Sequence, residues 1–402
     1  MLGKTNITTL TEGAVVTEIE DFKWVRMQPG VYGNFVKAIY ENGYLAAITA
    51  DGKVVYTTDG EAWQVSELEY ADCKLEDIAW DGSRFLLVGS YKDTIEMTDG
   101  TSGEFEIGLL LTTDNFTLYD YFKADTKKII SQYNYEYCSK YLAVYPSNGK
   151  WVVLAHEKYA GNSTSIPSKS IAMLVGGSDS QLERQSSYII RSDIGTICIG
   201  KNSQGILITN AYESKGRIYL VDGNTFKIQN KSLSGTGTIH RLPVFDCKDE
   251  LYYMGIESTA GYKLAKVLFS GEEIILSTGI DYRFIGGVYF NKCQLFINER
   301  EMMILKKGES ITDKTQEDLI EIAPENTLTC ITKAFGQLFV FGNQGLILKS
   351  STEGSSEEAI LIQTISAKKA LLEANAYTEQ RCKLLESKIA ALEAEIAGTE
   401  VK

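Results

Sequence analysis

Short apolar runs that alternate with polar residues, each bounded by turn residues, recur along most of the chain. One such unit covers residues 42–63: a turn, an apolar strand, a second turn at Asp51-Gly52, an alternating strand, and a Thr-x-Asp-Gly turn followed by Trp63. Alternation with a period of two between turn residues is typical of β-strands. The same order of features returns in six more units, which begin at Asp81, Ser147, Asn202, Lys248, Asn291 and Gly336.

A further apolar run precedes each unit. These runs are continuous rather than alternating, which predicts strands that are buried on both faces. In a propeller they would be the innermost strands. They lie at residues 35–40, 75–80, 141–145, 194–200, 241–245, 284–290 and 328–335.

Seven units at this spacing predict an all-β fold, a seven-bladed β-propeller. Most units follow one another at about the 40–50 residues that a four-stranded blade occupies. The two longer intervals predict loop insertions at residues 91–106 and 156–170. A β-sandwich rarely needs so long a chain, and the coils of a β-helix are much shorter. Six or eight blades remain alternatives to seven.

The two ends of the repeat region set the expected domain boundaries. We expect an N-terminal arm at residues 1–20, the propeller at 21–354 and a helical segment at 355–402. The last unit has no further strand after Ser350, whereas residues 21–27 form a strand-like run without a blade. This run is therefore expected to complete the seventh blade and close the ring, which removes its open edges. The alternative is an extra strand that caps the first blade.

The sequence after residue 356 predicts one long α-helix. Residues 357–397 contain neither glycine nor proline; Ser355 and Glu358 form a capping box, and Gly398 is a suitable stop. Apolar residues at heptad spacing predict a coiled coil between protomers, either a dimer or a trimer. The alternative is a helix that folds back on its own propeller. The seam consists of Leu371, Asn375, Cys382, Leu385, Ile389, Leu392 and Ile396, with a register shift expected near residues 372–380.

Charge and composition exclude several classes of partner. The net charge of −13 repels phosphate backbones, so no nucleic acid is expected as a partner. No apolar run reaches the roughly 20 residues that span a bilayer, so no membrane is expected either. The first residues lack the apolar core of a secretory signal. We therefore expect a soluble protein that is made in the cytoplasm.

Candidate chemistry is sparse. The seven cysteines form no C-x-x-C pair and there are only two histidines, His156 and His240, so no metal site and no cofactor are expected. Nucleotide-binding, zinc-protease and serine-hydrolase motifs are absent. We expect no catalytic residues. A glycosidase remains an alternative, because a propeller can bring two carboxylates together from different blades.

One turn carries a recognisable motif. The run from Thr57 to Trp63, with Thr57, Asp59, Gly60 and Trp63 as its structural residues, resembles the S/T-x-D-x-G-x-x-W Asp-box of sialidase-like (BNR) propellers, although it is one residue shorter. Weaker copies are Thr98-Asp99-Gly100 and Thr112-Thr113-Asp114. The resemblance implies a turn that stabilises a blade, in which Asp bonds backbone amides and Gly takes a positive φ. It does not imply catalysis.

Degenerate Asp-box propellers of this kind resemble tail fibre, baseplate or receptor-binding proteins of tailed bacteriophages and phage-derived contractile bacteriocins. The resemblance implies a non-enzymatic structural or adhesive protein that is assembled into a virion or tail-like particle. Its expected partners are further copies of itself, neighbouring tail proteins and a host surface glycan. The alternatives are a glycosidase acting on surface polysaccharide and an intracellular scaffold that docks other proteins.

Overall fold

The computed structural model describes most of residues 6–351. The C-terminal segment, residues 352–402, forms a second unit and lies outside the described residues, so the predicted coiled coil stays a prediction. Within the first unit the description omits residues 10–14, 20–21, 28, 69, 71, 127–128, 132, 161–168, 178–179, 191–193, 213–214, 234–238, 249–250, 260, 271, 276–282 and 307.

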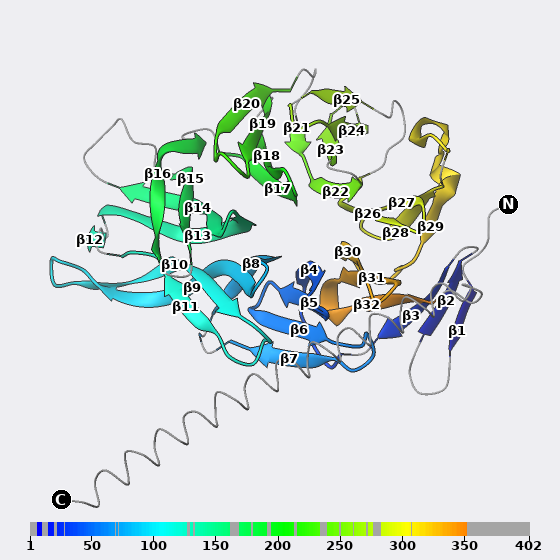
Figure 1. Cartoon of the computed structure of the whole chain (residues 1–402), viewed down its shortest axis with the longest axis horizontal. Helices are drawn as coiled ribbons and strands as arrows, with labels where there is room; N and C mark the ends of the chain where they lie inside the picture. The colour runs from blue at the N-terminus through cyan, green and yellow to red at the C-terminus, as the bar shows by residue number, and fades with distance from the viewer. Residues whose placement is uncertain are drawn as a thin grey trace, which may run out of the picture. The chain divides into compact units, whose positions relative to one another are not determined.

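Seven antiparallel sheets are arranged in a ring, which confirms the prediction of an all-β, seven-bladed propeller (Figure 1). The first three blades, each given from its innermost strand outwards, contain β4 (Phe35–Glu41), β5 (Tyr44–Thr49), β6 (Lys53–Thr57) and β7 (Gln64–Glu67); β8 (Lys74–Trp80), β9 (Phe85–Glu96), β10 (Ser102–Thr113) and β11 (Asp120–Lys123); and β13 (Asn134–Ser147), β14 (Lys150–Ala160), β15 (Lys169–Gly177) and β16 (Ser180–Ile190), with β12 (Ile129–Ser131) paired to β13.

The next three blades repeat this plan. Blade 5 has a divided innermost strand, whose two parts both pair with β23. These blades contain β17 (Thr196–Asn202), β18 (Gly205–Tyr212), β19 (Lys215–Asp222) and β20 (Ile228–Ser232); β21 (Ile239–Arg241) and β22 (Val244–Lys248), β23 (Leu251–Ser258), β24 (Gly261–Val267) and β25 (Glu273–Ile275); and β26 (Gly286–Phe290), β27 (Cys293–Ile297), β28 (Glu301–Leu305) and β29 (Leu319–Glu321), with the short 3-10 helices η1 (Ile311–Asp313) and η2 (Gln316–Asp318) before β29.

The seventh blade joins the two ends of the ring. It contains β30 (Leu328–Ala334), β31 (Gln337–Gly342) and β32 (Ile347–Ser351), with η3 (Asn343–Gly345) between the last two. Its fourth strand is β3 (Phe22–Met27), which pairs antiparallel with β32. The segment expected as an N-terminal arm contributes β2 (Val15–Ile19) and β1 (Asn6–Thr9), which extend the same sheet to six strands.

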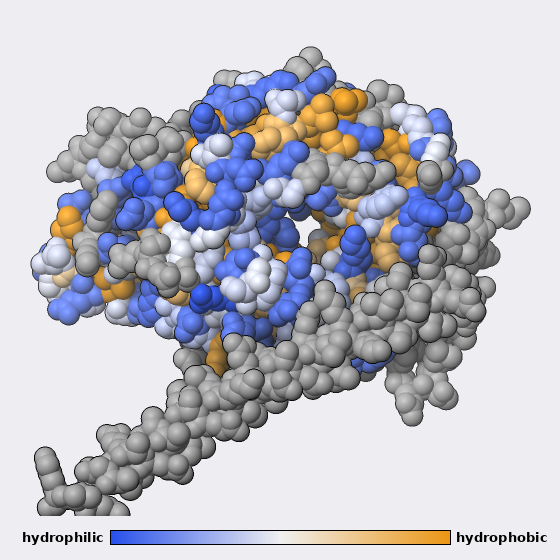
Figure 2. All heavy atoms as spheres, in the orientation of Figure 1, coloured by the Kyte–Doolittle hydropathy of each residue, from blue (hydrophilic) through white to orange (hydrophobic). Residues whose placement is uncertain are grey.

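In blades 1, 4 and 7 the second strand is more deeply buried than the innermost strand. In β5, β18 and β31 nearly every residue is buried, whereas β4 and β17 are half-buried along most of their length. The prediction that the innermost strands are buried on both faces is therefore wrong for these two strands, and also for β26 and β30. The innermost strands lie around the middle of the ring (Figure 1), and Figure 2 shows that an opening passes through it. The second strand has a neighbour on each side and a sheet against each face.

The predicted loop insertion at residues 91–106 is a regular hairpin. Strands β9 and β10 run for 12 residues each and are joined by a tight turn, in which Met97 N donates to Thr101 O at 2.8 Å. The distal part of this hairpin lies against blade 3, where the ring of Phe105 meets that of Tyr137 with centroids 5.7 Å apart. Contact with a neighbouring blade therefore orders the insertion. Of the second predicted insertion, residues 156–160 end β14, residues 169–170 begin β15, and those between lie outside the described residues.

The turn at residues 57–63 packs blade 1 against blade 7. Asp59 Oδ1 accepts from the amides of Glu61 (2.7 Å) and Ala62 (2.8 Å), and Thr57 Oγ1 accepts from the Gly60 amide (3.0 Å). Gly60 has a φ of +77°, and an added Cβ would lie 3.1 Å from atoms of both Phe335 and Phe339. A side chain there would strain both the backbone and the packing.

Aromatic packing and an ion pair complete this contact between the two blades. The centroid of the Trp63 ring lies 6.1 Å from the ring centroid of Phe339 and 6.3 Å from that of Phe341. Lys349 on β32 forms an ion pair with Glu61. The motif residues therefore have a structural role where the ring closes.

Of the two weaker copies of the motif, only one forms a turn like that of residues 57–63. The turn after β10 repeats the hydrogen bonds of residues 57–62, but one residue further along than expected: Thr113 Oγ1 accepts from the Phe116 amide at 2.9 Å, and Asn115 takes the place of Asp59. Phe116 has a φ of +61° and its ring packs on Tyr56 of blade 1. The run at Thr98–Gly100 lies in the β9–β10 turn, at the other end of the sheet.

A largely buried lysine links three blades beside the ring axis. Lys201 on β17 reaches across blade 3 and donates to Asp77 Oδ2 on β8 at 2.5 Å. It also donates to the carbonyl oxygens of Ile78 (3.2 Å) and Val144 (3.0 Å). The Val144 amide donates to the same Asp77 oxygen at 2.9 Å. Burial lowers the pKa of Lys201 to about 8, against the attraction of Asp77. The positive charge of Lys201 is therefore costly in this place without its carboxylate partner.

Candidate functional site

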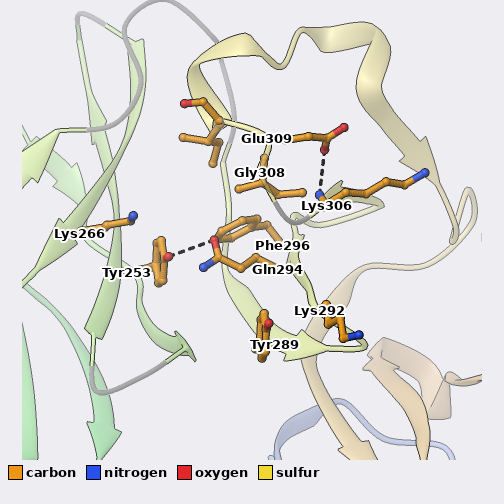
Figure 3. A pocket seen from close by; sticks show the side chains of 12 residues that line it. Tyr253, Lys266, Tyr289, Lys292, Gln294, Phe296, Lys306, Gly308 and Glu309 are labelled. Carbon is orange, nitrogen blue, oxygen red and sulfur yellow. Dashed lines mark hydrogen bonds between the residues drawn. The ribbon is translucent and has the colours of Figure 1, made fainter.

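A cavity of about 290 Å³ opens between blades 5 and 6, on the side of the ring where the innermost and second strands are joined by turns (Figure 3). Blade 5 contributes residues from β23 and β24, and blade 6 contributes the β26–β27 hairpin and the segment after β28. The lining residues are Tyr253, Lys266, Tyr289, Lys292, Gln294, Phe296, Leu305, Lys306, Gly308, Glu309, Ser310 and Ile311.

Aromatic rings form the floor of the cavity. Phe296 is fully buried and Tyr253 is 1% exposed, and their ring centroids lie 5.3 Å apart. The Tyr253 hydroxyl donates to Gln294 Oε1 at 3.1 Å, which Figure 3 shows as a bridge between the two blades. The floor is therefore rigid, because each of its side chains is held by packing or by a hydrogen bond to the neighbouring blade.

Three lysines come from separate elements around this floor. Lys266 on β24 holds its Nζ 5.9 Å from the centroid of the Tyr253 ring. Lys292 lies in the β26–β27 turn, where it has a φ of +64° and an exposed side chain. Lys306 follows β28. Among the described residues, Lys266 and Lys292 have no carboxylate partner, so their charges are available to a ligand.

The one carboxylate among the residues that line the cavity is already paired. Glu309 Oε2 accepts from the Lys306 amide at 2.8 Å and lies 2.9 Å from Lys314 Nζ. Its hydrogen bond to Lys314 lowers the pKa of Glu309, so this group stays ionised at neutral pH. Lys314 neutralises the negative charge of Glu309. The excess charge of the cavity is consequently positive, in a chain whose net charge is −13.

This arrangement can bind an anion that also has an apolar face. Ammonium groups attract carboxylate or phosphate oxygens, and the half-buried ring of Tyr289 can pack against the C–H face of a ring-shaped ligand. Glycoside hydrolysis needs a second carboxyl group whose pKa is raised so that it can donate a proton. The described lining residues offer no such group.

The residues singled out from the sequence do not line this cavity. Thr57, Asp59, Gly60 and Trp63 lie at the contact of blades 1 and 7, and Leu371, Asn375, Cys382, Leu385, Ile389, Leu392 and Ile396 lie outside the described residues. Sequence reasoning did not find the cavity, because its lysines are separated by strands from two blades. The one local signal is Asn291-Lys292, a pair of left-handed residues at a hairpin turn.

Metal and thiol chemistry are not prominent in the described part of the chain. No group of three or more His, Cys, Asp or Glu side chains there is arranged to hold a metal ion. Burial raises the pKa of Cys73, Cys138 and Cys330 to about 12, so these thiols are protonated at neutral pH and are poor nucleophiles. In the same described residues, no helix has the length and apolar character required to cross a membrane.

Comparisons with known proteins support the fold. No protein-family model matches the sequence, and no curated protein is significantly similar to it. Among solved structures, the chain is similar to virginiamycin B lyase from Staphylococcus aureus, with a TM-score of 0.52, 7% sequence identity and coverage of 82% of this chain and 98% of that chain. A catalytically inactive form of that lyase with quinupristin gives a TM-score of 0.52 at 9% identity, covering 87% of this chain and 99% of that chain.

The WD40 domain of Neurospora crassa Pan2 is also similar, with a TM-score of 0.50, 8% identity and coverage of 81% of this chain and 90% of that domain. At these identities the likeness shows a seven-bladed propeller fold alone. These neighbours include both an enzyme and a WD40 domain, so the fold by itself does not select a function.

Proposed function

We propose that this protein is a non-enzymatic adhesive component of a phage or phage-tail-like particle, and that it binds an acidic surface glycan in the cavity between blades 5 and 6. The observation that carries the proposal is the concentration of three lysines around a rigid aromatic floor in an otherwise acidic protein. Sugar rings offer C–H faces to tyrosine, and their carboxylate or phosphate substituents offer charge to lysine.

The assignment to a tail-like particle is supported by the Asp-box resemblance of residues 57–63 and by the heptad pattern near the C-terminus. A coiled coil would present several propellers together. Weak single contacts with a repetitive surface would then add up to a much higher avidity.

The cavity proposal predicts the effect of removing its available charges. The double variant Lys266→Ala, Lys292→Ala is expected to weaken binding of an acidic oligosaccharide, such as tetragalacturonate, by about 100-fold or more, since each lost charge-assisted hydrogen bond is worth about 1.5–3 kcal/mol. Isothermal titration calorimetry at two salt concentrations measures this. The affinity of the unchanged protein should fall as salt rises.

A matched control is Lys227→Ala, which removes an exposed lysine from blade 4, outside the cavity. It should leave the affinity unchanged. Equal binding of a neutral oligosaccharide, or equal loss in the control, would contradict the proposed site. Release of reducing ends from the acidic polymer would instead favour the glycosidase alternative.

The coiled-coil part of the proposal has its own test. The double variant Leu385→Asp, Ile389→Asp places two charges in the predicted seam and should convert an oligomer into a monomer, because an a/d position tolerates an unpaired charge poorly. Light scattering of the full chain measures the mass. Lys383→Asp, Ser387→Asp changes the charge at positions b and f, which face away from the seam, and should leave the oligomer intact. A monomeric mass for the unchanged chain would rule out self-association.

A further inference from the structure

A second cavity, of about 480 Å³, lies between blades 2 and 3. It is formed by the turn that joins β8 to β9 and the turn that joins β13 to β14. These are the same turns, within their blades, as the β26–β27 turn that carries Lys292. Successive innermost strands run in one direction around a propeller, so the two cavities open on the same face of the ring. The lining residues are Trp80, Asp81, Gly82, Ser83, Arg84, Pro146, Ser147, Asn148, Gly149, Lys150 and Trp151.

Both carboxylate oxygens of Asp81, which lines this cavity, accept hydrogen bonds from neighbouring groups of the protein. Asp81 Oδ1 accepts from the amide and hydroxyl of Ser83 and from the amide of Arg84, all at 2.8 Å. Asp81 Oδ2 accepts from Trp151 Nε1 at 3.0 Å. The carboxylate therefore fixes the first turn and the indole of the next blade. It does not neutralise the cations beside it through an ion pair.

Two cations in this cavity have no carboxylate partner among the described residues. The Arg84 guanidinium lies 5.8 Å from the centroid of the Trp151 ring, which is 3% exposed and so gives Arg84 a buried aromatic support. Lys150 is exposed at the edge of the cavity. A half-buried guanidinium held over an indole presents its planar fork in a restricted orientation, which suits a carboxylate or a phosphate.

The lining offers a further hydroxyl donor in Ser147, whereas the Ser83 hydroxyl is already donated to Asp81. Ser83 and Ser147 come one from each turn, and the Asn148-Gly149 pair turns the chain with φ values of +51° and +70°. Arg84 and Lys150, neither of which forms an ion pair in the described structure, are together with the Ser147 hydroxyl complementary to an oxyanion. The cavity differs from the one between blades 5 and 6, in which Tyr253 and Phe296 form the floor.

We infer that the cavity between blades 2 and 3 is a second oxyanion-binding subsite, which takes a carboxylate or phosphate group of the same acidic polymer that the cavity between blades 5 and 6 binds. The inference rests on the proposed function. Two subsites on one face allow a single polymer chain to contact one propeller twice. The second contact then becomes intramolecular and raises the affinity for a long polymer without raising it for a short oligomer.

The test is the number of short ligands that one protomer of the full chain binds. We expect two equivalents of tetragalacturonate, or of a short glycerol phosphate oligomer, by isothermal titration calorimetry; the two probes distinguish carboxylate from phosphate. The double variant Arg84→Gln, Lys150→Gln should bind one equivalent, and Lys266→Ala, Lys292→Ala should also bind one. For the corresponding long polymer, either variant should lose about 100-fold or more in affinity.

Single substitution of Lys150 by Gln guards against misfolding, because Lys150 is exposed and makes no ion pair in the described structure. It should weaken the second binding event about tenfold. One equivalent in the unchanged protein, lost in Lys266→Ala, Lys292→Ala and unaltered in Arg84→Gln, Lys150→Gln, would overturn the second subsite and leave the proposed function standing. Binding of neither acidic probe would overturn both.

Discussion

Replacement of Asp77 by alanine is expected to lower the free energy of unfolding by about 3–5 kcal/mol, the usual cost of removing one partner of a buried ion pair. Asp77 is buried, and the side chain of Lys201 is only 14% exposed. Without the carboxylate, the Lys201 ammonium would face two carbonyl oxygens in a poorly solvated place, and the Val144 amide would lose its acceptor. Chemical denaturation monitored by tryptophan fluorescence measures the change.

A double-mutant cycle separates the pair from the packing around it. Lys201→Met alone leaves Asp77 buried with Lys37 at 3.7 Å and should also be destabilising. Asp77→Ala, Lys201→Met removes both charges and should recover much of the loss, since no unpaired ion then stays in a poorly solvated place. Additive effects of the two substitutions would show that Asp77 and Lys201 do not act together.

Replacement of Trp24 by alanine is expected to cost about 3–5 kcal/mol, which is typical for removal of a large buried aromatic side chain. Trp24 is fully buried on β3 and belongs to a core with Leu338, Val340 and Leu348 of blade 7. The same strand supplies the backbone pairing to β32 that closes the ring. Loss of the Trp24 side chain should therefore allow the ring to open locally at the seventh blade, before the protein unfolds globally.

Amide hydrogen exchange tests whether the loss is local to this blade. In the variant with Trp24→Ala, amides of β3 and β32 should exchange faster than those of blade 4. Arg26→Ala is the matched control, because Arg26 lies on the same strand with a half-buried side chain. It should have little effect on β32. Uniform acceleration across all blades would show that β3 does not close an independent unit.

Local patterns along the chain were sufficient to predict the strands and the number of blades. A turn such as Asn42-Gly43, with φ values of +49° and +77°, depends on two adjacent residues, and a strand depends on alternation over five or six. These interactions are short in sequence, so the repeat could be read directly. The heptad seam from Leu371 to Ile396 is equally local, and it predicts an oligomer that awaits a mass measurement.

Contacts between blades were decided by the tertiary structure alone. How deeply a strand is buried depends on which residues cover it, so the half-buried state of β4 could not be predicted from its hydrophobicity. The regular hairpin structure of residues 91–106 could not be predicted either, because it depends on contact with the neighbouring blade. Asp77 and Lys201 are 124 residues apart, and Lys266 and Lys292 belong to different blades. Each side chain alone resembles an ordinary surface charge. Only closure of seven sheets around one axis brings these charges together, because that geometry is set by the packing of whole blades.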